Sequence, residues 1–293
     1  MVKSQNAKKL CRIYLCIMLL AFGCFGGLFG CGVQSESAEP GETADKPGIS
    51  VTFFDVGKGD AILVETKNHC MLIDSGYDDT AETILDYLER ENIDRLDYML
   101  ITHFDKDHVG GADHILEAVE VGEVLQPDYE SDAKQYREYM DTMEKMQISP
   151  RPVTETLCLS LDEAELLVYP PQRRDYKEED NDFSLVVSMH CGEKSILFAG
   201  DSEKERLEEL LDQQEFPLAH DILKVPHHGR KEKNSKEFLL AVMPETAIIT
   251  CSKENPPDQE ILQLLNQLGT KTYLSTEGTI TLSYNGKELK ISQ

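Results

Sequence analysis

The sequence has 293 residues, enough to bury the core of one large domain or of two small ones. It carries 54 acidic against 29 basic residues, which gives a formal net charge of −25 at pH 7. Because so acidic a surface repels polyanions, it excludes tight sequence-independent binding of duplex DNA, although a small phosphoester could still enter a metal-lined cleft.

The first 31 residues have the pattern of a secretory signal sequence. Several basic residues precede an apolar run over about residues 13–29, and glycines interrupt that run, which favours a cleaved signal over a permanent spanning helix. Residues 28–31, with the letters LFGC, resemble the box of bacterial lipoproteins. That resemblance implies acylation of Cys31 and attachment to the cell membrane. A retained membrane anchor and plain secretion are the alternatives, and each of the three outcomes exports the rest of the chain.

Residues 32–48 predict a flexible tether. They are rich in Ser, Glu, Gly and Pro and have almost no large apolar side chain, so they cannot bury enough surface to fold. We therefore expect one folded domain over residues 49–293.

The first half of this domain combines strands and helices. Apolar residues at Ile84, Leu85 and Leu88 have helical spacing, whereas continuous or alternating apolar runs predict strands. Strands are expected over 49–66 (two, joined by a Gly-rich turn at 57–60), 69–74, 96–102 and 155–171 (two). Helices are expected over 79–93, 110–120 and 131–148, and a polar loop over 172–182.

The second half repeats this order. A hairpin over 183–201 turns at Gly192-Glu193, and a final hairpin over 278–292 turns at Asn285-Gly286. Between them helices over 202–211, 234–243 and 259–269 alternate with strands over 221–226, 245–251 and 271–276. Because each half begins with strands and then alternates, we expect an α/β fold of two mixed sheets packed back to back, with helices on the outer faces.

Four cysteines fall within the predicted domain: Cys70, Cys158, Cys191 and Cys251. Their wide spacing, without a C-x-x-C pair, excludes a zinc ribbon. We expect buried free thiols, although export would permit disulfides.

Polar residues follow four of the predicted strands. Asp74 and Asp201 each end an apolar run, and the pair His227 and His228 ends another. Side chains at strand ends are held rigidly, so ligand sites gather there in layered α/β folds. Taken singly, however, Asp74 or Asp201 could equally be the cap of a following helix.

The strongest signal is the stretch THFDKDHVGG at residues 102–111. It places His103, Asp105, Asp107 and His108 within six positions directly after a strand. Imidazole and carboxylate are the ligands that zinc, manganese and iron take in proteins. One turn cannot enclose two metals by itself, and Asp201 with the His227-His228 pair supplies the missing ligand types.

These motifs, in this order, resemble the metallo-β-lactamase superfamily, in which the first motif is usually H-x-H-x-D-H. The replacement of a histidine by Asp105 and the stretches FFDVGKGDAILVE, NDFSLVV, LKVPHHG and TEGTITLSYNG are similar to the hydrolase domain of ComEC-type competence proteins and of their stand-alone secreted relatives. The resemblance covers about residues 50–292 and implies a four-layer αββα sandwich. Lys58 stands where that family usually has Gln, and Arg230 where it usually has Ser.

The resemblance also implies a two-metal site with zinc, or alternatively manganese. His103 and Asp105 would hold the first ion, and Asp107 and His108 the second. Asp201 would bridge the two ions, and either His227 or His228 would complete the second site. Asp180, Asn181 and Asp182 are the local candidates for a first-site histidine that this chain lacks. Asp74 would orient a histidine of the motif, and Asp107 and Asp201 would be the catalytic carboxylates.

A basic run surrounds the histidine pair and suggests an anionic substrate. We expect Lys224, Arg230 and Lys231 to contact that substrate, with Lys233 and Lys236 close by. The structural alternative is the solvated start of a helix.

The sequence therefore predicts an exported metal-dependent hydrolase in which a metal-activated water attacks a phosphodiester, from nucleic acid or from the cell envelope. Two alternatives remain: a hydrolase of amide or lactone bonds, and a non-catalytic envelope binding protein that keeps a metal for stability. The expected partners are the anionic substrate and the membrane, and the oligomeric state stays open.

Overall fold

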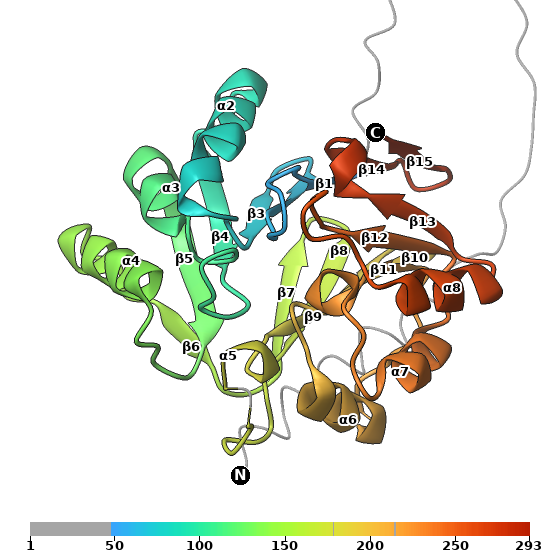
Figure 1. The fold of residues 1–293 in the computed structure, drawn as a ribbon. Coiled ribbons are helices and arrows are strands. Elements are labelled where there is room, and N and C mark those ends of the chain that lie inside the picture. Colours follow the sequence, from blue (N-terminus) through green and yellow to red (C-terminus); the bar gives the residue numbers. More distant parts are fainter. Residues whose placement is uncertain (1–47, 178, 214) are drawn as a thin grey trace, which may run out of the picture. The chain divides into compact units, whose positions relative to one another are not determined.

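The computed structural model describes residues 48–177, 179–213 and 215–293. The predicted signal sequence, the proposed lipidation of Cys31 and the tether up to residue 47 lie outside the described residues. The described part builds two β-sheets with helices on their outer faces (Figure 1).

The first sheet joins the two ends of the described chain. The early strand β1 pairs antiparallel with the late strand β14, in a register that sets Phe53 opposite Ile280. β3 and β4, by contrast, run parallel. In spatial order the strands are β15 (Leu289–Ser292), β14 (Ile280–Tyr284), β1 (Ile49–Phe53), β2 (Ile62–Thr66), β3 (Cys70–Ile73), β4 (Arg95–Leu100), β5 (Glu120–Pro127) and β6 (Arg151–Val153).

The second sheet takes its strands from the later part of the chain. β10, β11 and β12 are parallel neighbours, so their carboxyl ends meet at one edge. In spatial order the strands are β13 (Lys271–Leu274), β12 (Thr246–Ile249), β11 (Ile222–Lys224), β10 (Lys194–Phe198), β9 (Val186–Cys191), β8 (Ala164–Tyr169) and β7 (Leu157–Leu161).

Strand alternation creates three apolar layers. In β3, Met71 and Ile73 pack into the core between the sheets, while Leu72 packs into the core beneath the helices. The helices of the first sheet are α2 (Ala81–Glu91), α3 (Ala112–Ala118) and α4 (Lys134–Lys145). Those of the second are α6 (Lys204–Asp212), α7 (Ser235–Val242) and α8 (Gln259–Gln267). Short helical turns are η1 (Asp78–Thr80), α5 (Glu179–Asp182), η2 (Pro226–Gly229) and η3 (Ser275–Glu277). The predicted αββα sandwich is confirmed.

Some local expectations were wrong. β5 and β6 were not predicted, because Gly122 interrupts β5 and its first four residues are exposed or half-buried, so the strand lacks a clear apolar pattern. The polar loop over 172–182 contains the turn α5. Cys158 is exposed and Cys70 is half-buried, whereas Cys191 and Cys251 are buried as expected, and no disulfide links these four cysteines to one another.

Within the described residues, no helix has the length and apolar character needed to cross a membrane.

Candidate metal centre

The motif after β4 is folded by close backbone contacts. The N–H groups of His108 and Val109 both donate to the carbonyl of Asp105, at 2.9 Å. Gly110 permits this turn, because a Cβ atom at that position would lie 2.2 Å from the carbonyl oxygen of Lys106. The tight turn brings His103 and His108 together, with ring centroids 4.0 Å apart.

Both sheets contribute to one cluster at their strand ends. The Nε2 atom of His228, after β11, lies 2.9 Å from Oδ2 of Asp201, after β10. The same Asp201 oxygen lies 3.3 Å from Nε2 of His108, and Oδ2 of Asp107 lies 3.5 Å from Nε2 of His228. Two overlapping groups result, His103-His108-Asp201 and Asp107-His108-His228, in which the ligand atoms all lie within 4.8 Å of one another.

The donor atoms of this cluster fit a metal. The Nε2 atoms of His103, His108 and His228 are buried, and none makes a hydrogen bond. Buried polar atoms without partners are rare, and their convergence on Asp201 indicates that a cation is the missing partner. Among the predicted ligands, His103, Asp107, His108, Asp201 and His228 are brought together.

The electrostatics of the cluster also favour positive charge. Burial alone would lower the pKa of His108, but the carboxylates of Asp201 and Asp74 outweigh burial and hold the pKa well above its ordinary value. Burial would conversely raise the pKa of Asp201, and His228, His108 and Lys224 together hold it well below the usual range. A cation bound here would take the place of the protons on these imidazoles.

Each inner histidine is oriented through its other ring nitrogen. Nδ1 of His108 lies 2.8 Å from Oδ2 of Asp74, and Nδ1 of His228 lies 3.0 Å from the carbonyl oxygen of Thr250. Such contacts fix the tautomer and aim Nε2 at the metal. Asp74 thus occupies the position from which it would orient a histidine of the motif.

Asp105 lies at the rim of the cluster. Its side chain is 39% exposed, and its Oδ2 atom is 3.9 Å from Nε2 of His103. Burial and the nearby carboxylates of Asp180, Asp107 and Asp201 raise the pKa of Asp105 to about 6, against the opposing effect of His108. Because Asp105 lies close to His103 and to the carboxylates of Asp107 and Asp201, it remains a candidate ligand for an ion at the rim.

The structure distinguishes the two adjacent histidines. Both have left-handed backbones, with φ of 46° at His227 and 53° at His228, and such strain costs about 1–3 kcal/mol per residue and occurs mainly at functional sites. His228 enters the cluster, whereas Nδ1 of His227 lies 3.1 Å from Glu203. The expectation that His227 could be a metal ligand in this cluster is therefore not supported.

Asn181 and Asp182 support α6 instead of the cluster. Oδ1 of Asp182 accepts the backbone N–H groups of Glu203 and Arg206, each at 3.0 Å, and so caps the helix. Nδ2 of Asn181 donates to Glu203 at 2.8 Å. The prediction that Asn181 and Asp182 lie beside the metal ligands is therefore wrong, because both side chains bond to the start of α6. Of the three local candidates, Asp180 is the one whose charge acts on Asp105.

Lys224 was predicted to bind substrate, and its position contradicts this. Its side chain is fully buried and pairs with Asp60, while Nζ lies 3.4 Å from Oδ1 of Asp201. A side chain without exposed surface cannot meet a substrate.

Asp60 itself was missed by the sequence analysis. The signal for Asp60 was its place as the last residue of the Gly-rich turn at 57–60, and it also accepts a hydrogen bond from the Thr250 hydroxyl at 2.6 Å.

Lys58 is a partly exposed cation at the cluster. Its Nζ atom donates to Oδ2 of Asp107 at 2.7 Å, and its side chain is 18% exposed. Burial would raise the pKa of Asp107, but the nearby imidazole of His228, with Nε2 3.5 Å from Oδ2 of Asp107, and the charges of His108 and Lys58 hold that pKa below the usual range. Lys231 pairs with Glu260, and Arg230 is exposed; among the described residues no hydrogen bond or ion pair joins either side chain to the cluster.

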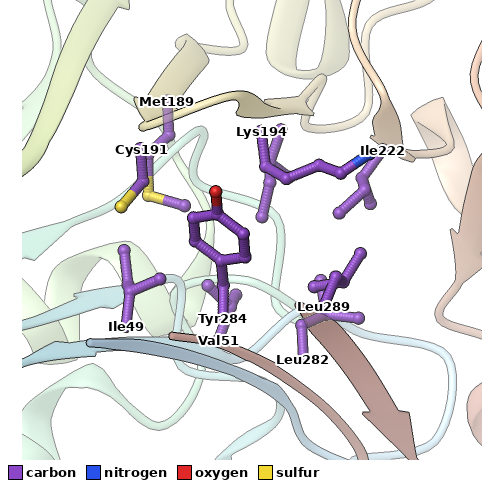
Figure 2. A pocket seen from close by; sticks show the side chains of 10 residues that line it. Ile49, Val51, Met189, Cys191, Lys194, Ile222, Leu282, Tyr284 and Leu289 are labelled. Carbon is purple, nitrogen blue, oxygen red and sulfur yellow. The ribbon is translucent and has the colours of Figure 1, made fainter. Parts of the chain in front are cut away.

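An apolar pocket lies elsewhere in the molecule. Figure 2 shows Tyr284 inside it, with Ile49, Cys191 and Lys194 around the ring. These residues stand at the strand ends opposite to the cluster, since Ile49 begins β1 and Lys194 begins β10. The pocket contains no group of metal-ligating side chains and belongs to the core between the sheets.

Fold and site together define a class of protein. A model of the metallo-beta-lactamase superfamily matches residues 54–252, and the chain belongs to that superfamily. It is 28% identical over 259 residues to the ComE operon protein 3 of Bacillus subtilis, covering 81% of this chain and 33% of that protein. It is 27% identical over 265 residues to Recombination protein 2 of Haemophilus influenzae, covering 85% and 30%. The resemblance to ComEC-type competence proteins is confirmed, and the chain spans about a third of the length of these relatives.

Solved structures share the fold at low sequence identity. CmlA, a diiron β-hydroxylase from Streptomyces venezuelae, matches with a TM-score of 0.54 and 17% identity over 83% of this chain and 55% of its own. A diphosphatase from the PhnP family matches with a TM-score of 0.51 and 15% identity over 83% of this chain and 100% of its own. At such identities these likenesses establish the fold alone.

Proposed function

We propose that the protein is an exported, metal-dependent phosphodiesterase. One observation carries this proposal: three buried imidazole Nε2 atoms, on His103, His108 and His228, have no hydrogen-bond partner and converge on Asp201. The superfamily typically holds two metals, and zinc or manganese suits imidazole and carboxylate donors.

In the proposed reaction the chain would bind two divalent ions and the substrate. When bound, such ions lower the pKa of water from about 15.7 to roughly 7 and offset the charge that develops during attack on a phosphoester. His103, His108, Asp201, Asp107 and His228 would hold the ions, with Asp105 at the rim. We assign to the carboxylates of Asp107 and Asp201 the catalytic role of accepting the proton of the attacking water.

The charge at the rim supports an anionic substrate. Lys58 carries an ammonium group next to Asp107 in a protein that is strongly acidic overall. A phosphodiester oxygen would gain a charge-assisted hydrogen bond from this group, whereas a neutral amide or lactone would gain less. Relatives with competence names point to nucleic acid, and the proposed export points to a phosphoester of the cell envelope.

The proposed location rests on the sequence of residues 1–31. A cleaved signal and acylation of Cys31 would anchor the domain outside the cell membrane, with residues 32–48 as the tether. The net charge leads us to propose weak binding to duplex DNA at physiological salt.

The test is hydrolysis by the full chain. Bis-p-nitrophenyl phosphate should be cleaved after loading with zinc or manganese and not after chelation, while nitrocefin and a homoserine lactone should be cleaved slowly or not at all. His108→Ala should abolish the phosphodiesterase activity. His114→Ala, on the exposed face of α3, serves as the control and should keep it.

Full activity of His108→Ala would overturn the proposed mechanism. Absence of turnover with every ester, together with a melting temperature raised by metal, would support a binding protein instead.

A further inference from the structure

A second group of potential metal ligands lies beside the cluster of His103, Asp107, His108, Asp201 and His228, which we call the main centre. It shares no residue with that centre. Glu203 precedes α6, His227 belongs to η2, and Glu232 lies in the segment before α7. One ligand atom from each of the three falls within 4.8 Å of the others. Three separate segments of the second half of the chain therefore meet at this point.

His227 is directed into this group by its backbone. Consecutive left-handed residues turn His227 and His228 apart, so that their ring centroids are 6.2 Å from each other. Nδ1 of His227 lies 3.1 Å from Oε1 of Glu203 and 3.7 Å from Oε1 of Glu232. A strained conformation that persists next to a functional centre indicates that the resulting direction of the ring matters.

The imidazole supplies an observation that does not depend on the carboxylates. His227 is 7% exposed, and its Nδ1 atom is buried and makes no hydrogen bond, despite its distance to the two Glu side chains. This buried nitrogen points between two carboxylates and donates a hydrogen bond to neither of them. A metal ligand would have the same position. Glu203 is held in position by the Nδ2 donor of Asn181, at 2.8 Å.

We propose that Glu203, His227 and Glu232 bind a further divalent cation of the zinc or manganese class, in a site separate from the main centre. One imidazole and two carboxylates form a mixed donor set that suits these ions. The bound ion would connect the start of α6 to the segment before α7 and would hold His227. Because His228 is the next residue, the ion would also support the backbone that presents His228 to the main centre.

The test counts the metal bound by the full chain. The protein is stripped with a chelator, loaded with excess Zn²⁺ or, in parallel, Mn²⁺, separated from free ion by gel filtration and analysed by mass spectrometry of the metal. Glu232→Gln should bind one equivalent fewer than the wild type. Glu237→Gln, which makes the same change at an exposed position of α7, should bind the wild-type number.

Two further variants make the outcome decisive. His227→Asn should also lose one equivalent, and Asn tolerates the left-handed backbone. Asp201→Asn should lose metal from the main centre and keep the equivalent that Glu232→Gln loses. Circular dichroism identifies the folded variants. The proposal is overturned if either Glu232→Gln or His227→Asn is folded and keeps the full complement, or if folded Asp201→Asn binds no metal. These counts do not depend on turnover, so they stand apart from the test of the hydrolase.

Discussion

Asp74 binds the imidazole of His108 through one carboxylate oxygen, at 2.8 Å, while its other oxygen accepts the backbone N–H of Thr102 at 2.7 Å. The carboxylate thereby fixes the ring of His108 relative to the strand end that carries the motif. Asp74 has a φ of 58°, a conformation that Asn adopts nearly as well, so Asp74→Asn tests the charge with little change in the backbone.

We expect Asp74→Asn to weaken metal affinity by about 10–100-fold, the usual effect of removing a partner that orients a metal-ligating histidine. Competition with a chelating dye measures the affinity. Asp97→Asn is the matched control, because Asp97 contacts the half-exposed His69 at 3.1 Å, close to the opposite end of β4. Equal losses in the two variants would show that Asp74 has no specific role in metal binding.

Lys224 should contribute strongly to stability. Removing its ammonium with Lys224→Met leaves the buried carboxylates of Asp60 and Asp201 without their cation, and we expect a loss of about 3–5 kcal/mol in the free energy of unfolding of the metal-free protein. Urea unfolding measures the loss. Lys194→Met, whose partly exposed ammonium pairs with Asp221 and Glu245, should cost about 1 kcal/mol or less.

A double-mutant cycle checks the cause. If Lys224 acts by neutralising Asp60, Asp60→Asn combined with Lys224→Met should cost less than the sum of the two single changes. Strict additivity would assign the loss to packing of the lysine stem.

Lys58→Gln, which introduces the residue usual in the resembling family, should weaken binding of anionic substrates. Loss of one charge-assisted hydrogen bond predicts a rise of about tenfold in KM for a phosphodiester, with a smaller change in kcat. The dependence of kcat/KM on salt should also decrease. Steady-state kinetics at two salt concentrations provide the measurement. Lys67→Gln, at an exposed position after β2, should leave KM unchanged; a similar rise in both variants would point to net charge alone.

The hydrogen bonds between Asp162 and Asn68 should make the free energy of unfolding depend on pH in the acidic range. Asp162 accepts hydrogen bonds from the Asn68 side chain and the Thr66 hydroxyl, each at 2.7 Å, and these contacts lower its pKa from 3.8 to about 2. Because the folded-state pKa is the lower one, the stabilisation is complete above about pH 4 and is lost as the pH falls towards 2.

Urea unfolding at pH 5 and pH 3 tests this expectation. The wild type should lose more stability between the two pH values than Asp162→Asn does, whereas Asp86→Asn, on the exposed face of α2, should follow the wild type. Identical losses in the wild type and Asp162→Asn would contradict the assignment.

The sequence predicted the layers and most of the main cluster because both depend on local pattern. Strand and helix periods are visible along the chain, and a histidine- and aspartate-rich turn after an apolar strand is a local feature. The choice between His227 and His228 was not available from sequence, since it depends on two left-handed backbone conformations. Lys224 was misplaced although a signal existed: it lies two residues after Ile222, which packs into the core between the sheets, so strand alternation directs it inward.

The pairing of β1 with β14 has a consequence for how the molecule is made. β1 is the first strand of the described chain, and β14, its neighbour on one side, lies near the other end. Phe53 is therefore synthesised long before its partner Ile280. Contacts this distant in sequence slow folding, and an apolar strand with an open edge is prone to join other chains. The first sheet can therefore be completed only after translation of its last strands, and a nascent chain needs protection from aggregation until that moment.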